Sequence, residues 1–179
     1  MLAAKKDIQA SYPEVNVCPA LADVTDQKAV DAVFASLGKV DILVNNAGHL
    51  SAVATIADSG IDDWWSGFEI NVKGAFIVTQ AFLKAAAPNA ILINVTTAIA
   101  QGPPMSHCSS YASSKLAQSK FFDCVQAENP DLHVVNVHPG IVLTDMVRKS
   151  LAAGASFSVF DDGEWTTVMD KTHAKKFFL

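Results

Sequence analysis

The chain has 179 residues, of which 50% are hydrophobic and 17% are charged, and its formal net charge is -5. This composition is typical of one globular domain, and the acidic balance without a lysine and arginine cluster argues against a nucleic-acid partner. Prolines, asparagines and a glutamine interrupt the uncharged stretch 85–114, so it is no membrane span. Three cysteines (Cys18, Cys108 and Cys124) without CxxC spacing favour a reducing, cytoplasmic location and predict no metal site.

The first part of the chain alternates helical patterns with short apolar runs. Residues 1–10 have the pattern of the second half of a helix, and the apolar run 15–21 predicts a strand. Thr25 is a candidate N-cap for a helix that Gly38 closes. The run VDILV at residues 40–44 predicts the next strand.

The alternation continues through the second part of the chain. Helices are predicted over residues 62–86 and about 110–127, the second stopped by Asn129-Pro130, and strands over 90–95 and 132–137. The apolar runs are rich in Val, Ile and Leu and lack polar alternation, as expected of parallel strands covered on both faces. Strand–helix–strand repetition predicts a doubly wound, Rossmann-like α/β sheet.

Polar or small residues follow each predicted strand. They are Asp23 after the first strand, Asn45 to Gly48 after the second, Thr96 and Thr97 after the third, and His138-Pro139-Gly140 with Thr144 after the fourth. In open parallel sheets, ligands bind beyond the carboxyl ends of the strands. This edge of the sheet is therefore the candidate binding site.

Tyr111 and Lys115 are four residues apart in a predicted helix and therefore share one of its faces. Taken alone, such a pair is most simply an ordinary surface pair. A free phenol has a pKa of about 10, and a nearby ammonium favours the tyrosinate by opposite charge. Lys115 is therefore expected to lower the pKa of Tyr111, so that the phenol can exchange a proton with a substrate.

Five motifs occur in the order found in the short-chain dehydrogenase/reductases, which residues 1–150 resemble. They are DILVNNAG, Asn71 in NVKGAF, NVTT, the segment from Tyr111 to Lys115, and HPGIVLTDM. The resemblance implies an oxidoreductase that uses NAD or NADP on a small alcohol or carbonyl substrate. Tyr111 would exchange the proton while the nicotinamide exchanges a hydride with the same carbon.

The resemblance also implies roles for single residues. Tyr111, Lys115, Thr97 and Asn71 would be catalytic: Lys115 also bonds the nicotinamide ribose, and Asn71 holds a water in a proton relay. The implied cofactor-binding residues are Asp23, Asn45, Ala47, Gly48, Tyr111, Lys115, Pro139, Gly140, Ile141 and Thr144. Asp23 is either a helix-entry residue or an adenine contact, and Asn45 is expected both to brace the sheet and to line the cofactor cleft.

The hydroxyl donor at the third strand departs from the family pattern. The family usually presents a serine where this strand ends Thr96-Thr97-Ala98. Thr97 matches the serine's place in the strand motif, but the usual spacing back from Tyr111 lands on Ala98. A one-residue insertion in the loop 101–107 explains the difference most simply, so the role is assigned to Thr97. The extra methyl group crowds the substrate, and altered or impaired activity is expected.

The glycine-rich turn that receives the pyrophosphate is the second departure. None of the nine glycines begins such a pattern, so the resemblance implies an incomplete chain without the family's first two strands. The strand 15–21 would then be separated from the strand 40–44 by the space of the two missing strands, or it would pair with 40–44 directly. Without such a partner, the strand 40–44 exposes an apolar edge. Residues 1–150 are expected to form the partial Rossmann-like domain, and 151–179 an atypical C-terminal tail.

Two functions remain open from the sequence. The leading hypothesis is the NAD(P)-dependent oxidoreductase. This hypothesis includes the case in which the truncated chain has lost its activity. The alternative is a non-catalytic truncated isoform that acts as a dimerisation or interaction module. Family members pair through the helices equivalent to 62–86 and 110–127, so a homodimer or homotetramer is expected, with no nucleic-acid or membrane partner.

Overall fold

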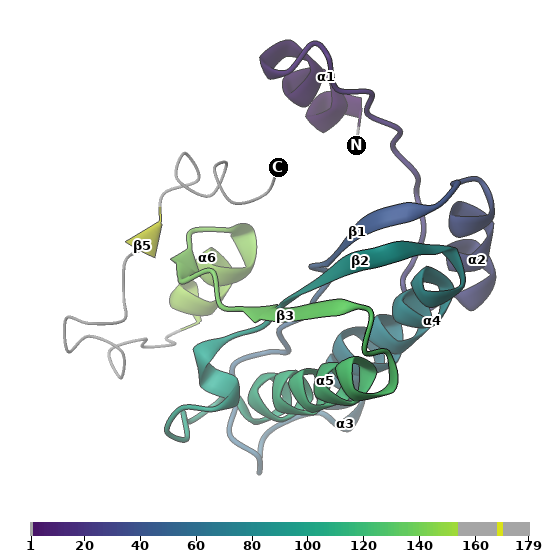
Figure 1. The fold of residues 1–179 in the computed structure, drawn as a ribbon. Helices are drawn as coiled ribbons and strands as arrows, with labels where there is room; N and C mark the ends of the chain where they lie inside the picture. Colours follow the sequence, from purple (N-terminus) through teal and green to yellow (C-terminus); the bar gives the residue numbers. More distant parts are fainter. Residues whose placement is uncertain (1, 154–167, 170–179) are drawn as a thin grey trace.

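The computed structural model describes residues 2–153 and 168–169. Its centre is a parallel sheet of three strands in the order β1-β2-β3, namely β1 (Val40–Asn45), β2 (Ala86–Val95) and β3 (His133–Val137). Beyond the end of β3, β4 (Ile141–Val142) pairs in parallel with β5 (Val168–Met169) (Figure 1). Most of the predicted tail, residues 154–167 and 170–179, lies outside the described residues.

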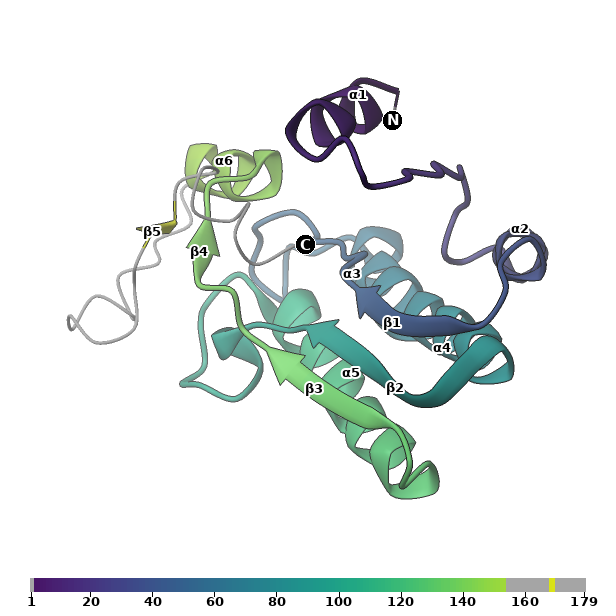
Figure 2. The same ribbon diagram turned by 45° about the horizontal axis from the view of Figure 1, so that its top comes forward.

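Helices connect the strands of the sheet. They are α1 (Leu2–Ser11), α2 (Gln27–Ala35), α3 (Ile61–Phe68), the π-helical η1 (Glu69–Gly74), α4 (Ala75–Ala85), the 3-10 turn η2 (Ala98–Ala100), α5 (Ser109–Glu128) and α6 (Asp145–Ala152). The helix predicted over 62–86 is the continuous run α3–η1–α4. Figure 2 shows α4 and α5 behind the three strands and α2 beside α4. Among the described residues, every helix is too short or too polar to cross a lipid bilayer.

The core lies between the sheet and the helices on this one face. Leu43, Leu92 and Val134 occupy one row across the three strands and pack toward the helices. They meet Phe82 of α4 and Phe122 of α5, which are both fully buried. Burying one such side chain contributes about 1.5–3 kcal/mol, so this row and the two phenylalanines fix the helices against the strands.

The opposite face of the sheet is open. Side chains alternate between the faces of a strand, so Ile42, Val44, Val135 and Val137 point away from α4 and α5. All four are exposed, Ile42 to 54%. The expectation that the strands are covered on both faces is therefore wrong for the described residues, because no described element buries these side chains. The predicted apolar edge at residues 40–44 is confirmed, since β1 pairs with β2 alone among the described strands.

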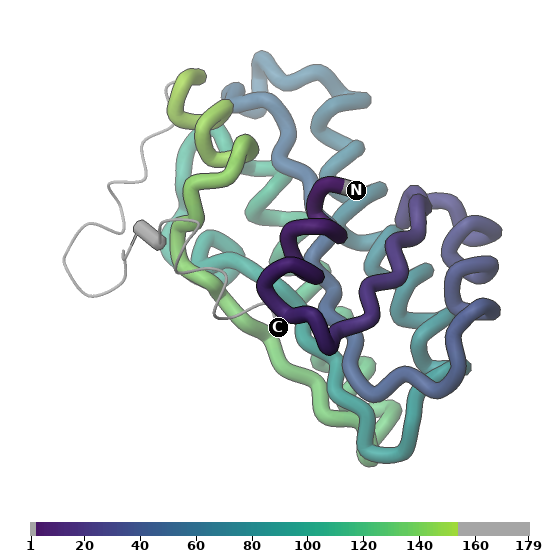
Figure 3. The backbone as a smooth tube through the Cα atoms, turned by 90° about the horizontal axis from the view of Figure 1, so that it is seen from above, coloured from purple at the N-terminus to yellow at the C-terminus, as the bar shows by residue number. Residues whose placement is uncertain are grey.

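The strand predicted over residues 15–21 is not formed. Residues 12–26 contain only turns and irregular backbone, and they lead from α1 to α2 (Figure 3). Leu21 is 88% exposed and Val15 is also exposed. An apolar run becomes a strand only where a neighbouring strand accepts its backbone hydrogen bonds, and no described strand lies beside this segment.

Asp26, and not Thr25, caps α2. The Asp26 carboxylate accepts hydrogen bonds from the backbone N–H groups of Lys28 (2.9 Å) and Ala29 (3.2 Å). The Thr25 hydroxyl instead donates to Asp23 over 2.8 Å, so it is used in the turn before the helix. Thr25 and Asp26 are both good N-cap types, and the local turn decides between them.

β2 begins at Ala86, earlier than the predicted start at residue 90. The register with β1 passes from Val40 opposite Ala86 to Ile42 opposite Ile91, which marks a bulge in β2. Asn89 within the bulge has a left-handed φ of 57°. Pro88 has no N–H for the ladder, and bulges and edges are where sheets tolerate proline.

Candidate functional site

Asn71 lies in the π-helical turn η1, where the run from α3 to α4 widens. Its side chain is fully buried. The Asn71 Oδ1 atom accepts from the His49 N–H (2.7 Å), and Nδ2 donates to the His49 carbonyl (3.0 Å) and to Ser114 Oγ (2.9 Å). Single π-helical turns occur often at functional sites, and this one ties the segment after β1 to α5.

The amine of Lys115 lies beside Asn71 at the carboxyl end of β2. Lys115 is 4% exposed, and its Nζ atom donates to the Val95 carbonyl (3.0 Å) and to Gln118 Oε1 (2.9 Å). Burial lowers the pKa of Lys115 to about 8. A Cβ atom at Gly48 would lie 3.4 Å from Lys115 Nζ and 3.5 Å from Asn71 Oδ1. The glycine therefore keeps free the space where the amine and the amide meet.

Tyr111 has a raised pKa, first because burial disfavours the phenolate and second because Cys108 lies near it. A hydrogen bond with the Thr97 hydroxyl acts the other way and lowers the pKa of Tyr111. The expectation that Lys115 lowers this pKa is wrong for the described chain. Desolvation outweighs the hydrogen bond, and the Lys115 amine bonds Val95 and Gln118 instead.

The two threonines at the end of β2 have different partners. The Thr96 hydroxyl forms a 2.8 Å hydrogen bond with Ser119 of α5, while Thr97 meets Tyr111. Ala98, at the usual family spacing from Tyr111, begins η2 and carries no hydroxyl. Thr97 is thus the threonine in contact with Tyr111.

Three asparagines form a ladder across the sheet just before the site. Asn45, Asn94 and Asn136 share one register row of β1, β2 and β3. Asn45 Nδ2 donates to Asn94 Oδ1 (3.1 Å), and Asn94 Nδ2 donates to Asn136 Oδ1 (2.8 Å). Asn45 therefore braces the strand ends. Sequence reasoning missed the other two, whose signal was an asparagine near the end of each of the three apolar runs.

Six further residues were predicted to contact the cofactor. They are Asp23, Ala47, Pro139, Gly140, Ile141 and Thr144. Asp23 accepts from the backbone of Thr25 (2.8 Å) in the turn before α2, and Thr144 caps α6 through Val147 (3.4 Å). Gly140 has a φ of 77°, which favours glycine. Within the described residues, no hydrogen bond joins these residues to the group around Lys115.

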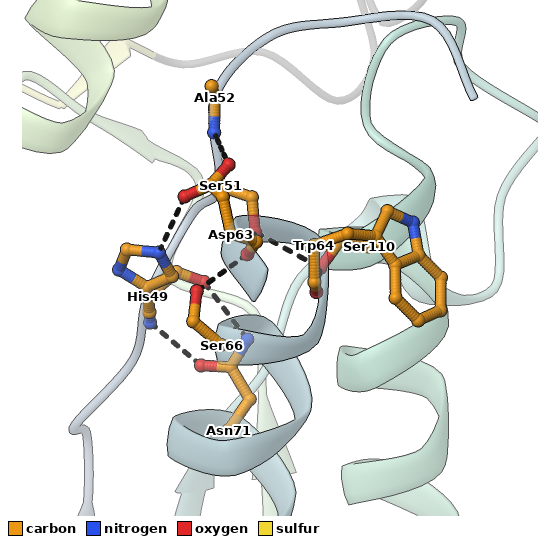
Figure 4. A network of polar contacts seen from close by, with 8 residues as sticks. All are labelled: His49, Ser51, Ala52, Asp63, Trp64, Ser66, Asn71 and Ser110. Atoms are coloured by element: carbon orange, nitrogen blue, oxygen red, sulfur yellow. Dashed lines mark hydrogen bonds and ion pairs between the residues drawn. The ribbon is translucent and has the colours of Figure 1, made fainter. Parts of the chain in front are cut away.

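A polar network holds the N-terminus of α5, directly before Tyr111 (Figure 4). Ser51 Oγ donates to the Asp63 carbonyl (2.9 Å) and contacts Ser110 Oγ (3.1 Å), and Ser110 Oγ donates to the Trp64 carbonyl. His49 Nε2 lies 3.9 Å from Asp63 Oδ1. The segment after β1, the start of α3 and the start of α5 are thereby fixed together. No motif pointed to Ser51 or Ser110.

A cavity of about 180 Å³ lies beside this network. Residues of the segment 50–60, the start of α3 and residues 107–111 line it, Tyr111 included. Within the part of the chain that the structure describes, no group of three or more His, Cys, Asp or Glu side chains is placed to hold a metal ion. Tyr111, which is half-buried, therefore lies at the wall of a cavity and beside the Thr97 hydroxyl.

The sequence matches one protein family and several of its members. The short chain dehydrogenase family matches residues 1–154. The short chain dehydrogenase pigC of Monascus ruber is 34% identical over 139 residues, which cover 72% of this chain and 45% of that protein. The NADP-dependent 3-hydroxy acid dehydrogenase of Schizosaccharomyces pombe is 32% identical over 148 residues, which cover 78% of this chain and 56% of that protein.

The fold has a solved counterpart. The crystal structure of a short chain dehydrogenase from Burkholderia cenocepacia in complex with NADP matches with a TM-score of 0.81 at 22% identity, over 98% of this chain and 72% of that one. The chain spans about half the length of the curated relatives it matches. These matches confirm the predicted partial Rossmann-like fold, and the chain belongs to the short chain dehydrogenase family.

Proposed function

We propose that this chain carries the catalytic part of an NAD(P)-dependent oxidoreductase that interconverts an alcohol and a carbonyl compound. Two pairs of side chains near the carboxyl ends of β1 and β2 support the proposal: Thr97 lies beside Tyr111, and Lys115 and Asn71 both lie beside Gly48. Ligands bind at this edge in open parallel sheets. The names of two similar proteins, which specify NADP, support that cofactor for this chain.

The residues of the chain divide the chemistry between them. When bound, NAD(P) supplies the hydride acceptor or donor. In the reduction direction, the Tyr111 phenol, which its raised pKa keeps protonated, would donate its proton to the substrate oxygen as the carbonyl carbon gains a hydride, which leaves an alcohol, oxidised cofactor and a tyrosinate. The Thr97 hydroxyl polarises the substrate oxygen. Lys115, through a water held at Asn71, returns a proton to the tyrosinate.

The nicotinamide end of the cofactor fits the residues around Gly48. An ammonium has three donors, and Lys115 uses two of them on Val95 and Gln118, so one remains for a ribose hydroxyl. Gly48, which has no side chain, lies beside this amine. Asp23, Asn45, Ala47, Pro139, Gly140, Ile141 and Thr144 are proposed to complete the contacts. A glycine-rich cradle for the pyrophosphate is not among the residues of this sequence.

Paired substitutions test the catalytic roles. Tyr111→Phe removes the proton donor and is expected to lower carbonyl reduction with NADPH at least about 100-fold, with an unchanged circular dichroism spectrum. Thr97→Ala is expected to lower the rate of carbonyl reduction as well. Thr96→Ala serves as its control, because the Thr96 hydroxyl bonds Ser119 and not Tyr111. Full activity in Tyr111→Phe would refute these roles.

A non-catalytic interaction module is the second candidate. Phe76 of α4 is 49% exposed and lies against Phe121 of α5, with ring centroids 6.0 Å apart. Trp65 of α3 and Leu116 of α5 are also exposed. Exposed aromatic and aliphatic side chains of this kind mark protein contacts. We propose that these helices form a homodimer or homotetramer interface, whichever function is correct.

Two measurements separate the candidates. Saturable quenching of protein fluorescence by NADPH supports the oxidoreductase, while its absence together with a dimer in analytical ultracentrifugation supports the interaction module. Phe76→Glu is expected to shift the chain to monomer without preventing NADPH binding.

The three cysteines are free, which supports the proposed cytoplasmic location.

A further inference from the structure

The cavity beside Tyr111 has the size of a single ring. Its volume is about 180 Å³. A dry cavity of about 150 Å³ inside a protein holds one benzene molecule. A five- or six-membered ring therefore fits inside this cavity.

Much of the wall of this cavity is apolar. Leu50, Ala54, Trp64 and Cys108 line it, and Cys108 is buried. The Trp64 indole is held in place, because its Nε1 donates to Ser109 Oγ over 3.0 Å. A ring that enters the cavity removes its apolar surface from water, which is favourable. The Trp64 side chain does not have to move to receive it.

The charged side chains of the wall are carboxylates. Asp58 and Asp63 line the cavity, and no lysine or arginine does so within the described residues. Each carboxylate uses one oxygen locally: the Ala52 N–H donates to Asp63 over 2.8 Å, and the Thr55 hydroxyl donates to Asp58. The other oxygen of Asp63 lies 3.9 Å from His49 Nε2, and His107 also lines the cavity. Where these imidazoles are neutral, an anionic group placed here meets two carboxylates and no lysine or arginine of the described residues.

We propose that this cavity is the substrate subsite next to Tyr111, and that it accepts a neutral or cationic ring-sized apolar group while rejecting carboxylates. The inference rests on the proposed function, since it names the substrate class of the same site. The enzyme then oxidises cyclic or ring-bearing alcohols, or reduces the matching ketones. Hydroxy acids are poor substrates, because their carboxylate would lie against Asp58 and Asp63.

Three probes with one ring and different charges test the proposal without turnover. Cyclohexanol, cyclohexylamine and cyclohexanecarboxylate are each titrated into the full chain at pH 8, where histidine is ordinarily neutral, with saturation-transfer difference NMR as the readout. Cyclohexanol and cyclohexylamine are expected to bind and to compete with each other. Cyclohexanecarboxylate is expected to bind at least about 10-fold more weakly. Equal binding of all three, or no binding of any, would overturn the proposal.

Matched variants locate the binding in this cavity. Ala54→Trp fills the cavity and is expected to abolish cyclohexanol binding, while Ala57→Trp on the same segment, outside the lining, is expected to leave it unchanged. Asp58→Lys is expected to raise the affinity for cyclohexanecarboxylate at least about 10-fold, and Asp62→Lys is its control. Circular dichroism confirms that each variant folds. Unchanged probe binding in Ala54→Trp would refute the location.

The failure of this inference differs from the failure of the proposed function. Tyr111→Phe keeps the ring of the side chain and is expected to bind cyclohexanol while losing turnover. Turnover in the wild type without probe binding would overturn the subsite alone. Probe binding in the wild type without any turnover would overturn the oxidoreductase alone.

Discussion

The amide nitrogen of Asn71 lies 2.9 Å from the hydroxyl oxygen of Ser114, one residue before Lys115. The same nitrogen donates to the His49 carbonyl, so both of its N–H bonds are used inside a fully buried environment. Asn71 thereby links the segment after β1, the π-helical turn and α5. The relative position of Gly48 and Lys115 depends on this link.

Ser114→Ala is expected to destabilise the protein by about 1–3 kcal/mol, because one buried Asn71 N–H loses its acceptor. Ser113→Ala is the matched control: Ser113 is exposed in the same helical turn, so its free energy of unfolding is expected to change by less than about 0.5 kcal/mol. Urea unfolding followed by circular dichroism measures both. Equal effects of the two substitutions would show that the Asn71 contact contributes nothing.

Gly67→Ala tests how closely α3 approaches α5. A Cβ atom at Gly67 would overlap Ser110 Oγ, and overpacking of this kind costs about 1–3 kcal/mol. Removing that oxygen relieves the overlap, so adding Ser110→Ala to Gly67→Ala is expected to cost less than the sum of the two single changes. Gly60→Ala, with open space around its Cβ position, is the control. Strictly additive free energies of unfolding would contradict the predicted contact.

The sequence predicted β1, β2 and β3 because each apolar run meets a partner strand in the final sheet. It failed at residues 15–21, where the run has the same composition but no strand beside it. Composition reports how well a segment suits a strand, whereas pairing depends on neighbours that are distant in sequence. For the same reason, the sequence could not show that none of the described helices packs on one face of the sheet.

Ile42→Lys tests the open face of the sheet. Ile42 is exposed on the edge strand β1, where a lysine opposes pairing with another chain. The substitution is expected to reduce concentration-dependent association in sedimentation velocity and to change the free energy of unfolding by less than about 1 kcal/mol. Asp41→Asn, at an exposed neighbour, changes the net charge by the same amount and controls for it. If both variants lower association equally, charge alone explains the effect.

Spacing predicted that Tyr111 and Lys115 share one face of a helix, whereas Asn71 was expected only from the resemblance of NVKGAF to the family motif. Their electrostatics could not be predicted in the same way. The pKa of Tyr111 depends on its burial and on Cys108 and Thr97, and the Lys115 amine is held by Gln118. These contacts combine side chains from β2 and α5 whose depth in the fold is set by the whole core.

The low pKa of Lys115 predicts how stability depends on pH. It falls from the ordinary 10.5 to about 8, so between pH 8 and 10 the unfolded chain binds more protons than the folded one. The free energy of unfolding is therefore expected to rise through this window, by up to about 1.4 kcal/mol per pH unit, and to gain nothing from Lys115 below pH 8. Above pH 10 the raised pKa of Tyr111 acts in the opposite direction.

Urea unfolding at pH 8 and 9.5 measures this rise in the free energy of unfolding. Lys115→Met is expected to remove it, whereas Lys120→Met, at an exposed position of α5, is expected to keep it. Equal slopes in the wild type and Lys115→Met would show that the amine is not desolvated by the fold.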